Sequence, residues 1–242
     1  MNELSVIVPC LSRIDTIPRF IDNLAGILME NPSDIEVMVV ANEQAVSDAS
    51  RIVEYVRHQY PWLKFSFLER AGGMRSFGAL ARFGISYSTS HFAVLVSPYG
   101  EDDITILPMM LKTIRNGIQV VQATRYSTPD DERQISIRFR LYQSVYRLLT
   151  KMFLGYTITD STYGFKMFDR AFVQALGLSQ NGYSICPEIT LKALLAEGKV
   201  EYVSSAMRPS PMNKDFKLAR EGIGYLWLLL RGFGHRIGIL WF

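Results

Sequence analysis

The order of apolar runs constrains the fold of this chain more than any other feature. Five short apolar runs alternate with longer segments whose apolar residues recur at helical spacing. The runs cover residues 4–9, 35–40, 63–68, 92–96 and 118–124. Short, continuously apolar runs are typical of strands in a parallel sheet, because helices bury both faces of such a sheet. The pattern predicts an α/β fold with a doubly wound, mostly parallel sheet.

The composition sets the broad class of the protein. The chain has 242 residues, of which 48% are hydrophobic, so it can bury a full core. A net charge of +3 does not by itself indicate a nucleic-acid partner, and we expect none. Cys10 and Cys186 are far apart and form neither a disulfide framework nor a metal cluster. These features predict a reduced, cytoplasmic setting.

The last residues differ from the rest of the chain. Residues 223–242 mix Trp, Leu and Phe with basic residues, and Arg231, His235 and Arg236 interrupt the apolar run before it could span a membrane. Such a mixture is typical of a segment lying in a membrane interface, although a helix packed on the domain is the alternative. We therefore divide the chain into a domain of residues 1–222 and an amphipathic segment, and predict a peripheral protein at the inner face of the membrane.

The turn after the run at residues 92–96 carries three consecutive acids, Glu101, Asp102 and Asp103. Ligands of open α/β sheets bind beyond the carboxyl ends of the strands. The sequence therefore predicts a ligand at this turn, with a metal as a further option. The alternative is that the acids only cap the next helix, whose dipole favours negative charge at that end.

Five motifs occur in the order found in one known family. They are residues 5–9, 37–40, 78–85, 123–126 and 160–166. The ordered set resembles family 2 glycosyltransferases of the GT-A fold, and within them the polyprenyl-phosphate sugar synthases such as dolichyl-phosphate mannose synthases. The resemblance covers nearly the whole chain. It implies a GT-A sheet flanked by helices, followed by the amphipathic helical segment at the C-terminus.

The donor half departs from the family pattern. The acidic signatures expected after the first and second strands are replaced by residues 11–14 and 41–44, and the two aspartates of the Asp-x-Asp motif fall at Ser97 and Tyr99. The resemblance still implies a set of donor-binding positions. They are Pro9, Asn42, Glu43, Arg75, Gly78, Ser97 and Tyr99. A divalent cation, Mg²⁺ or Mn²⁺, would have to use a displaced site, for which Glu101 with Asp103 is the candidate.

The acceptor half keeps the family pattern better. By resemblance, Asp160 lies near the sugar and Glu188 supports the floor of the site. The implied phosphate and acceptor positions are Arg125, Arg140, Ser144, Arg208 and Lys217. Arg140 and Ser144 are four residues apart and so share one helix face, and the forked donors of arginine suit a phosphate dianion.

The resemblance implies transfer of a sugar from an activated, nucleotide-linked donor to a polyprenyl-phosphate-type lipid at a membrane surface. The alternative is a catalytically degenerate GT-A domain that binds a lipid phosphate or a protein partner. Another sugar-nucleotide enzyme on a similar sheet is a third reading, but no glycine-rich nucleotide signature follows the first strand. The sequence leaves the oligomeric state open.

Overall fold

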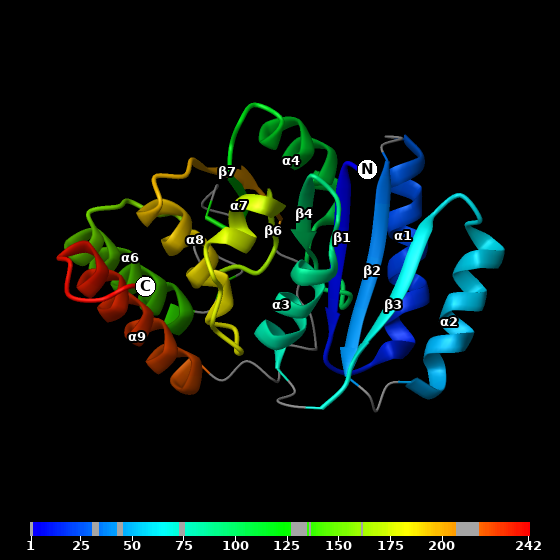
Figure 1. Cartoon of the computed structure of the whole chain (residues 1–242), viewed down its shortest axis with the longest axis horizontal. Helices are drawn as coiled ribbons and strands as arrows, with labels where there is room; N and C mark the ends of the chain where they lie inside the picture. Colours follow the sequence, from blue (N-terminus) through cyan, green and yellow to red (C-terminus); the bar gives the residue numbers. More distant parts are fainter. Residues whose placement is uncertain are drawn as a thin grey trace.

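A seven-stranded sheet forms the centre of the protein (Figure 1). The computed structural model describes residues 2–30, 34–42, 46–72, 76–126, 135, 137–160, 162–206 and 218–242. The strands are β1 (Leu4–Cys10), β2 (Ile35–Asn42), β3 (Lys64–Arg70), β4 (Phe92–Leu95), β5 (Val120–Thr124), β6 (Lys166–Asp169) and β7 (Val200–Ser204). Their order is β3-β2-β1-β4-β6-β5-β7, and only β6 runs antiparallel to its neighbours. The predicted α/β fold with a mostly parallel sheet is confirmed.

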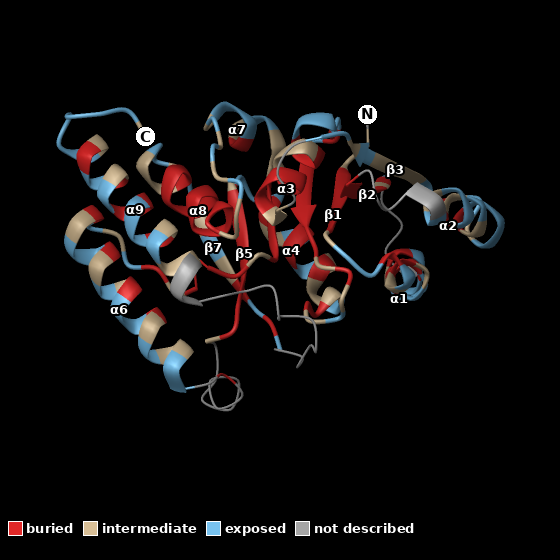
Figure 2. Cartoon of the chain, turned by 90° about the horizontal axis from the view of Figure 1, so that it is seen from below, coloured by how far each residue is buried: buried red, intermediate tan, exposed pale blue. Residues whose placement is uncertain are grey.

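Helices cover both faces of the sheet (Figure 2). The described helices are α1 (Ile17–Glu30), α2 (Val46–Gln59), α3 (Phe77–Tyr87), α4 (Leu107–Ile114), α6 (Ile137–Leu154), α7 (Arg170–Ala175), α8 (Ile185–Leu195) and α9 (Leu218–Arg236), with short 3₁₀ turns η1 (Ile14–Thr16) and η3 (Ile104–Ile106). Helices α1, α2 and α4 share one hydrophobic cluster with the sheet, and α3, α7 and α8 share another. Successive side chains of β1 enter opposite clusters, which explains why its run is apolar throughout.

Two strand predictions were wrong, one at the end of β1 and one at β6. We expected Pro9 to end the first strand, but β1 continues through it to Cys10. The carbonyl of Ile7 accepts a hydrogen bond from Val96, so the backbone groups of every second residue of β1, including residue 9, face β4. The pairing of β1 with β4 ends at Leu95, before it reaches residue 9. The missing N–H of the proline therefore leaves no ladder bond unmade.

The strand β6 was missed because its first residue is Lys166, which interrupted the apolar pattern expected of a buried strand. The Lys166 side chain is nevertheless fully buried. Its ammonium donates to Gln122 Oε1 at 2.6 Å and to Thr190 Oγ1 at 2.9 Å, and burial lowers its pKa to about 7. Inserted between β4 and β5, this antiparallel strand brings residues 162–165 beside the carboxyl ends of its neighbours.

Most of the C-terminal segment belongs to the helix α9, which begins at Leu218, before the division predicted between residues 222 and 223, and ends at Arg236. One face of α9 packs on α6 and α8 in a third cluster that includes Tyr146, Leu191, Tyr225 and Leu228. The helices α6 and α9 lie side by side at the end of the molecule farthest from α2 (Figure 1). Among the described residues, none of the helices is both long enough and apolar enough to cross a membrane.

Candidate functional site

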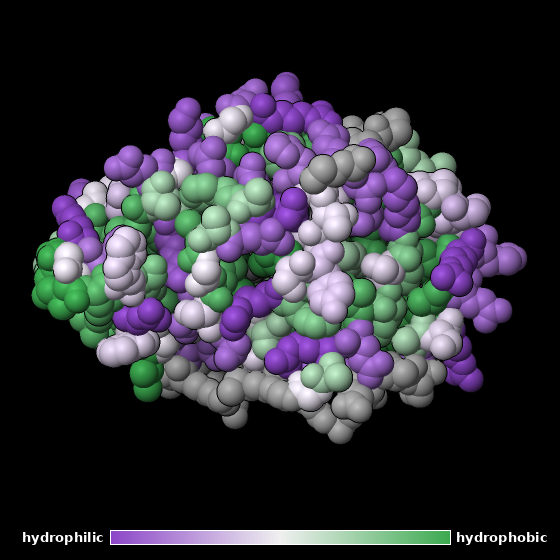
Figure 3. Space-filling model, viewed as in Figure 1, coloured by the Kyte–Doolittle hydropathy of each residue, from purple (hydrophilic) through white to green (hydrophobic). Residues whose placement is uncertain are grey.

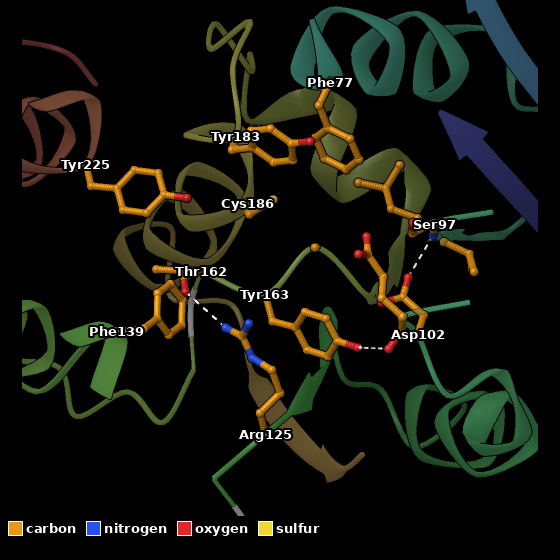
Figure 4. Close-up of a pocket in the computed structure, with 14 residues that line it drawn as sticks. Phe77, Ser97, Asp102, Arg125, Phe139, Thr162, Tyr163, Tyr183, Cys186 and Tyr225 are labelled. Atoms are coloured by element: carbon orange, nitrogen blue, oxygen red, sulfur yellow. Dashed lines mark hydrogen bonds between the residues drawn. The ribbon is translucent and has the colours of Figure 1, made fainter. Parts of the chain in front are cut away.

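A cavity of about 100 Å³ lies beyond the carboxyl end of β4 (Figure 4). Leu95, Val96 and Ser97 supply one side of it. Its other walls come from segments far apart in the chain, namely Phe77, Glu101, Asp102, Arg125, Phe139, Thr162, Tyr163, Gly164, Tyr183, Cys186 and Tyr225. The position at the strand ends is the one expected for a ligand in an open α/β sheet.

Arg125 and Asp160 form a buried ion pair below this cavity. The guanidinium donates from Nε to Oδ2 at 2.7 Å and from Nη2 to Oδ1 at 2.9 Å, and the backbone N–H of Arg125 also reaches Oδ2 at 3.3 Å. The rings of Phe139 and Tyr163 lie 5.1 and 4.5 Å from the guanidinium carbon (Figure 4). A buried guanidinium requires such a counter-charge.

This pairing changes the interpretation of both residues. Asp160 does not line the cavity and contacts two residues that do, Arg125 and, at 3.4 Å, the Thr162 hydroxyl, so it is a positioning residue. Arg125 does line the cavity, but the carboxylate of Asp160 offsets its charge. Arg125 therefore contributes hydrogen-bond donors to the cavity rather than a net positive charge.

The turn after β4 is closed by its own hydrogen bonds. The backbone N–H of Ser97 donates to Asp102 Oδ2 at 2.7 Å. The Tyr99 hydroxyl accepts from the N–H groups of Leu11 and Ser12, both at 3.1 Å, and donates to the Ser12 carbonyl at 2.8 Å. Tyr99, at the place of the second aspartate of the family motif, thus fastens this turn to the loop after β1.

Asp102 is a buried carboxyl group without an arginine or lysine in an ion pair among the described residues. Burial, and then repulsion by the charge of Glu101, raises its pKa to about 7. The Ser97 N–H and the neighbouring Tyr163 hydroxyl partly oppose that rise. Asp102 is therefore a cavity residue that exchanges a proton near neutral pH, a property that the acidic run alone did not reveal.

The residues at this turn do not fit a divalent cation. Asp103 Oδ1 accepts from the Thr105 N–H at 3.3 Å and from its hydroxyl at 2.7 Å, so Asp103 caps η3 as the alternative interpretation expected. Within the described part of the chain, no three His, Cys, Asp or Glu side chains converge on a possible metal position. The predicted site at Glu101 and Asp103 thus lacks the carboxylate-rich ligand set that Mg²⁺ and Mn²⁺ prefer.

The sequence matches Glycosyl transferase family 2 over residues 5–177. The chain belongs to this family. No curated protein sequence matches it. Its fold is similar to glucosyl-3-phosphoglycerate synthase from Mycobacterium tuberculosis, solved with Mn²⁺, uridine diphosphate and phosphoglyceric acid (TM-score 0.67, 16% identity, 99% of this chain and 80% of that one). The fold is also similar to that of mannosyl-3-phosphoglycerate synthase from Rubrobacter xylanophilus, with a TM-score of 0.66 and 14% identity. The alignment covers 99% of this chain and 76% of that one.

A third structural relative of this family 2 domain is the mannosyltransferase PcManGT from Pyrobaculum calidifontis, solved with GDP-Man and Mn²⁺. It has a TM-score of 0.60 and 14% identity, and the alignment covers 98% of this chain and 64% of that one. At these identities the likeness shows the fold alone. These three relatives do not test the resemblance to polyprenyl-phosphate sugar synthases, which stays a prediction.

The predicted donor positions of the family 2 domain occupy different settings. Asn42, at the end of β2, is buried, and its side-chain amide makes no hydrogen bond with any described residue. Gly78 instead serves packing, since a Cβ there would lie 2.5 Å from the Gly182 carbonyl oxygen. Glu43 and Arg75 lie outside the described residues. An unsatisfied buried amide costs about 1–3 kcal/mol, so Asn42 is the donor-side residue best prepared for a ligand.

Glu188 supports the cavity through a loop. It is fully buried at the start of α8 and accepts from the N–H groups of Ser179 and Gln180, both at 2.9 Å. The loop that it holds leads to Tyr183, whose ring stacks on Phe77 at 5.0 Å over the cavity (Figure 4). Glu188 itself does not line the cavity.

The structure describes three of the five predicted phosphate positions, and of these Arg125 lines the cavity. Arg140 and Ser144 both project from α6, but neither lines the cavity. Arg140 is half-buried, and its Nε atom makes no hydrogen bond with any described residue. Arg208 and Lys217 lie outside the described residues.

Sequence reasoning missed the aromatic side chains that shape the cavity. The clearest are Phe77, Phe139, Tyr163, Tyr183 and Tyr225. Of these five residues, only Tyr163 lies inside a motif that the sequence analysis singled out, the one at residues 160–166. The other four come from separate helices and loops, and an aromatic residue on a helix is more often part of the core.

Proposed function

We propose that this family 2 domain transfers a sugar from a nucleotide-activated donor to the phosphate of a polyprenyl-phosphate-type lipid. The family match over residues 5–177 carries the proposal, supported by a cavity at the strand ends where that fold holds its substrates. The lipid acceptor rests on the sequence resemblance, whereas two structural relatives are 3-phosphoglycerate synthases, one of them solved with phosphoglyceric acid.

The residues of this chain suit an anionic acceptor. A phosphate oxygen is already deprotonated at neutral pH, so it can attack the sugar carbon without a strong base. One bond forms between that oxygen and the sugar carbon, and the bond from this carbon to the nucleoside diphosphate breaks. The tasks left to the protein are alignment and neutralisation of the departing phosphate. We assign alignment to Arg125, which lines the cavity while Asp160 offsets its charge, and neutralisation to Arg140 on α6, which stands outside the cavity wall.

The donor side rests on fewer groups. We assign Asn42 to the donor because its buried amide has no hydrogen-bond partner among the described residues, and Ser97 because it lines the cavity at the end of β4. No step of this mechanism passes through a metal, since the described side chains do not fit one. The chemistry therefore depends on cationic side chains and on a cavity with an aromatic wall.

The test is a binding titration followed by an activity measurement. UDP-, GDP- and CDP-sugars are added with and without Mn²⁺ while the unfolding temperature is recorded, because a ligand of the native state alone stabilises it. A rise with one nucleotide-sugar is expected. Sugar transfer is then measured with a short-chain polyprenyl phosphate and with 3-phosphoglycerate, and transfer to 3-phosphoglycerate alone would overturn the lipid acceptor.

A second function is a degenerate domain that binds a phosphorylated lipid or a protein without catalysis. It is favoured by one observation, the replacement of the Asp-x-Asp carboxylates by Ser97 and Tyr99, with the Tyr99 hydroxyl used inside the protein. If no nucleotide-sugar raises the unfolding temperature under any condition, while a short-chain polyprenyl phosphate does, this second function replaces the first.

A further inference from the structure

The outward face of α6 is apolar, although a surface helix normally presents polar residues there. The residues that pack inward, including Gln143, Tyr146 and Thr150, occupy the opposite side of the helix. The outward stripe recurs every three or four residues, and each side chain is 47–73% exposed. It consists of Ile137, Leu141, Val145, Leu148 and Met152.

The neighbouring helix α9 has the same construction. Its inward face carries Tyr225, Leu228 and Leu229, which are fully buried against α6 and α8. Its outward stripe is 37–74% exposed. It consists of Ile223, Leu226, Trp227, Leu230 and Phe233, and Ile237 follows directly after the helix.

Together the two stripes form one apolar surface at the end of the molecule, which we call the α6–α9 face. The helices lie against each other through Tyr142, Tyr146 and Tyr225 and through Phe153 and Phe233. Hydrophobic residues gather at the corresponding end of the space-filling view (Figure 3). A contiguous apolar surface of this kind marks an interaction site.

The charges around the α6–α9 face indicate what covers it. Helix α6 carries Arg138, Arg140, Arg147 and Lys151 and contains no carboxylate. None of these four cations forms an ion pair with a residue in the described part of the chain. The carboxylate of α9, Glu221, accepts from the Tyr183 N–H and so belongs to the interior side of the helix.

We propose that the α6–α9 face docks on an anionic lipid surface. Apolar side chains flanked by cations match a bilayer whose acyl boundary is apolar and whose headgroups are negative. Trp227 and Trp241, which are 58% and 89% exposed, add the aromatic groups that prefer that boundary. A second copy of this chain is a poorer match, because it would bring the same four cations of α6 toward one another.

The docked orientation places the cavity near the headgroups. Phe139 and Tyr225 line the cavity, and they belong to the same two helices that form the face. A phosphate carried by a lipid would therefore approach the cavity along α6, past Arg140. Docking itself does not depend on the proposed reaction, and it deepens that proposal by naming the surface from which the acceptor comes.

The test is sedimentation of the full chain with phosphatidylcholine vesicles, with and without phosphatidylserine. We expect binding to the anionic vesicles only, weakening as salt is added. Arg138→Gln with Lys151→Gln should lower the partition constant roughly fivefold for each charge removed. Leu148→Glu with Trp227→Glu should lower it about a hundredfold or more, because two anchors become charged.

The matched control is Met109→Glu on α4, since Met109 is 58% exposed, as are Leu148 and Trp227. It should leave vesicle binding unchanged. Equal binding to both kinds of vesicle would overturn the anionic surface. A failure to bind either kind, together with a dimer in solution that Leu148→Glu dissociates, would assign the face to a second copy. Docking without sugar transfer to any acceptor would remove the proposed reaction but keep this inference.

Discussion

Two buried aspartates near the cavity have opposite surroundings. Asp160, in the loop between α6 and β6, accepts hydrogen bonds on both oxygens from Arg125. Asp102, in the turn after β4, lies beside the Ser97 N–H, the Tyr163 hydroxyl and the like charge of Glu101. Burial penalises a carboxylate in both places. The ion pair offsets that penalty for Asp160, while the pKa of Asp102 rises to about 7. The position of one arginine thus distinguishes the two sites: Asp160 is held in an ion pair, whereas Asp102 has no arginine or lysine partner among the described residues.

The comparison extends to the two halves of the site. On the donor side, the polar groups of Ser97, Tyr99 and Asp103 bind partners within the protein. On the proposed acceptor side, the Arg125–Asp160 pair anchors a cavity with an aromatic wall. The turn that stands in place of the family's metal motif is therefore closed by its own hydrogen bonds.

The largest expected effect tests the ion pair. Asp160→Asn leaves the buried Arg125 charge uncompensated and should lower the free energy of unfolding by about 3–5 kcal/mol. Urea denaturation measures the loss. The double variant Arg125→Met with Asp160→Leu removes both charges and should recover much of it. If the double variant is as unstable as Asp160→Asn, the pair is not what makes Asp160 necessary.

The next effect tests the titration of Asp102. The folded chain keeps a proton on Asp102 up to about pH 7, whereas the unfolded chain releases it near pH 4. The group therefore lowers the free energy of unfolding as the pH rises through this window. Between pH 5 and 8, Asp102→Asn should gain about 3 kcal/mol relative to the parent chain. Parallel stability profiles of the two chains would show that Asp102 has no raised pKa.

A smaller effect tests the rebuilt turn. Tyr99→Phe removes the hydroxyl that joins the turn after β4 to Leu11 and Ser12, and it should cost about 1 kcal/mol. Tyr87→Phe is the matched control, because Tyr87 is 57% exposed on α3, and it should change nothing. Thermal unfolding compares the two. Equal unfolding temperatures would mean that Tyr99 does not hold the loop.

The smallest effect on stability is expected where Arg140 and Ser144 are replaced, although this change should abolish binding of the acceptor. Arg140→Ala with Ser144→Ala should change the free energy of unfolding by no more than about 0.5 kcal/mol, because neither side chain forms an ion pair among the described residues. The same variant should no longer bind a short-chain polyprenyl phosphate in calorimetry. Lys112→Ala on α4 is the control. Unchanged binding would remove Arg140 and Ser144 from the acceptor site.

The sequence predicted the regular part of the fold well. Residues 35–40 and 118–124 became β2 and β5 with small shifts at their ends, because a strand buried on both faces has to be apolar throughout. It failed at β6, where buried polar partners accommodate Lys166, and at the end of β1, where the neighbouring strand stops before Pro9. Both failures depend on what lies beside the strand.

The sequence by itself determined the alternation of strands and helices, the family, and the strand ends at which a ligand is expected. Tertiary structure alone decided the chemistry there. It paired Arg125 with Asp160 and the Tyr99 hydroxyl with the loop after β1. It also joined the apolar faces of α6 and α9 into one surface. Periodicity reports which face of an element is apolar, whereas charge pairing and burial depend on distances through space that local spacing does not contain.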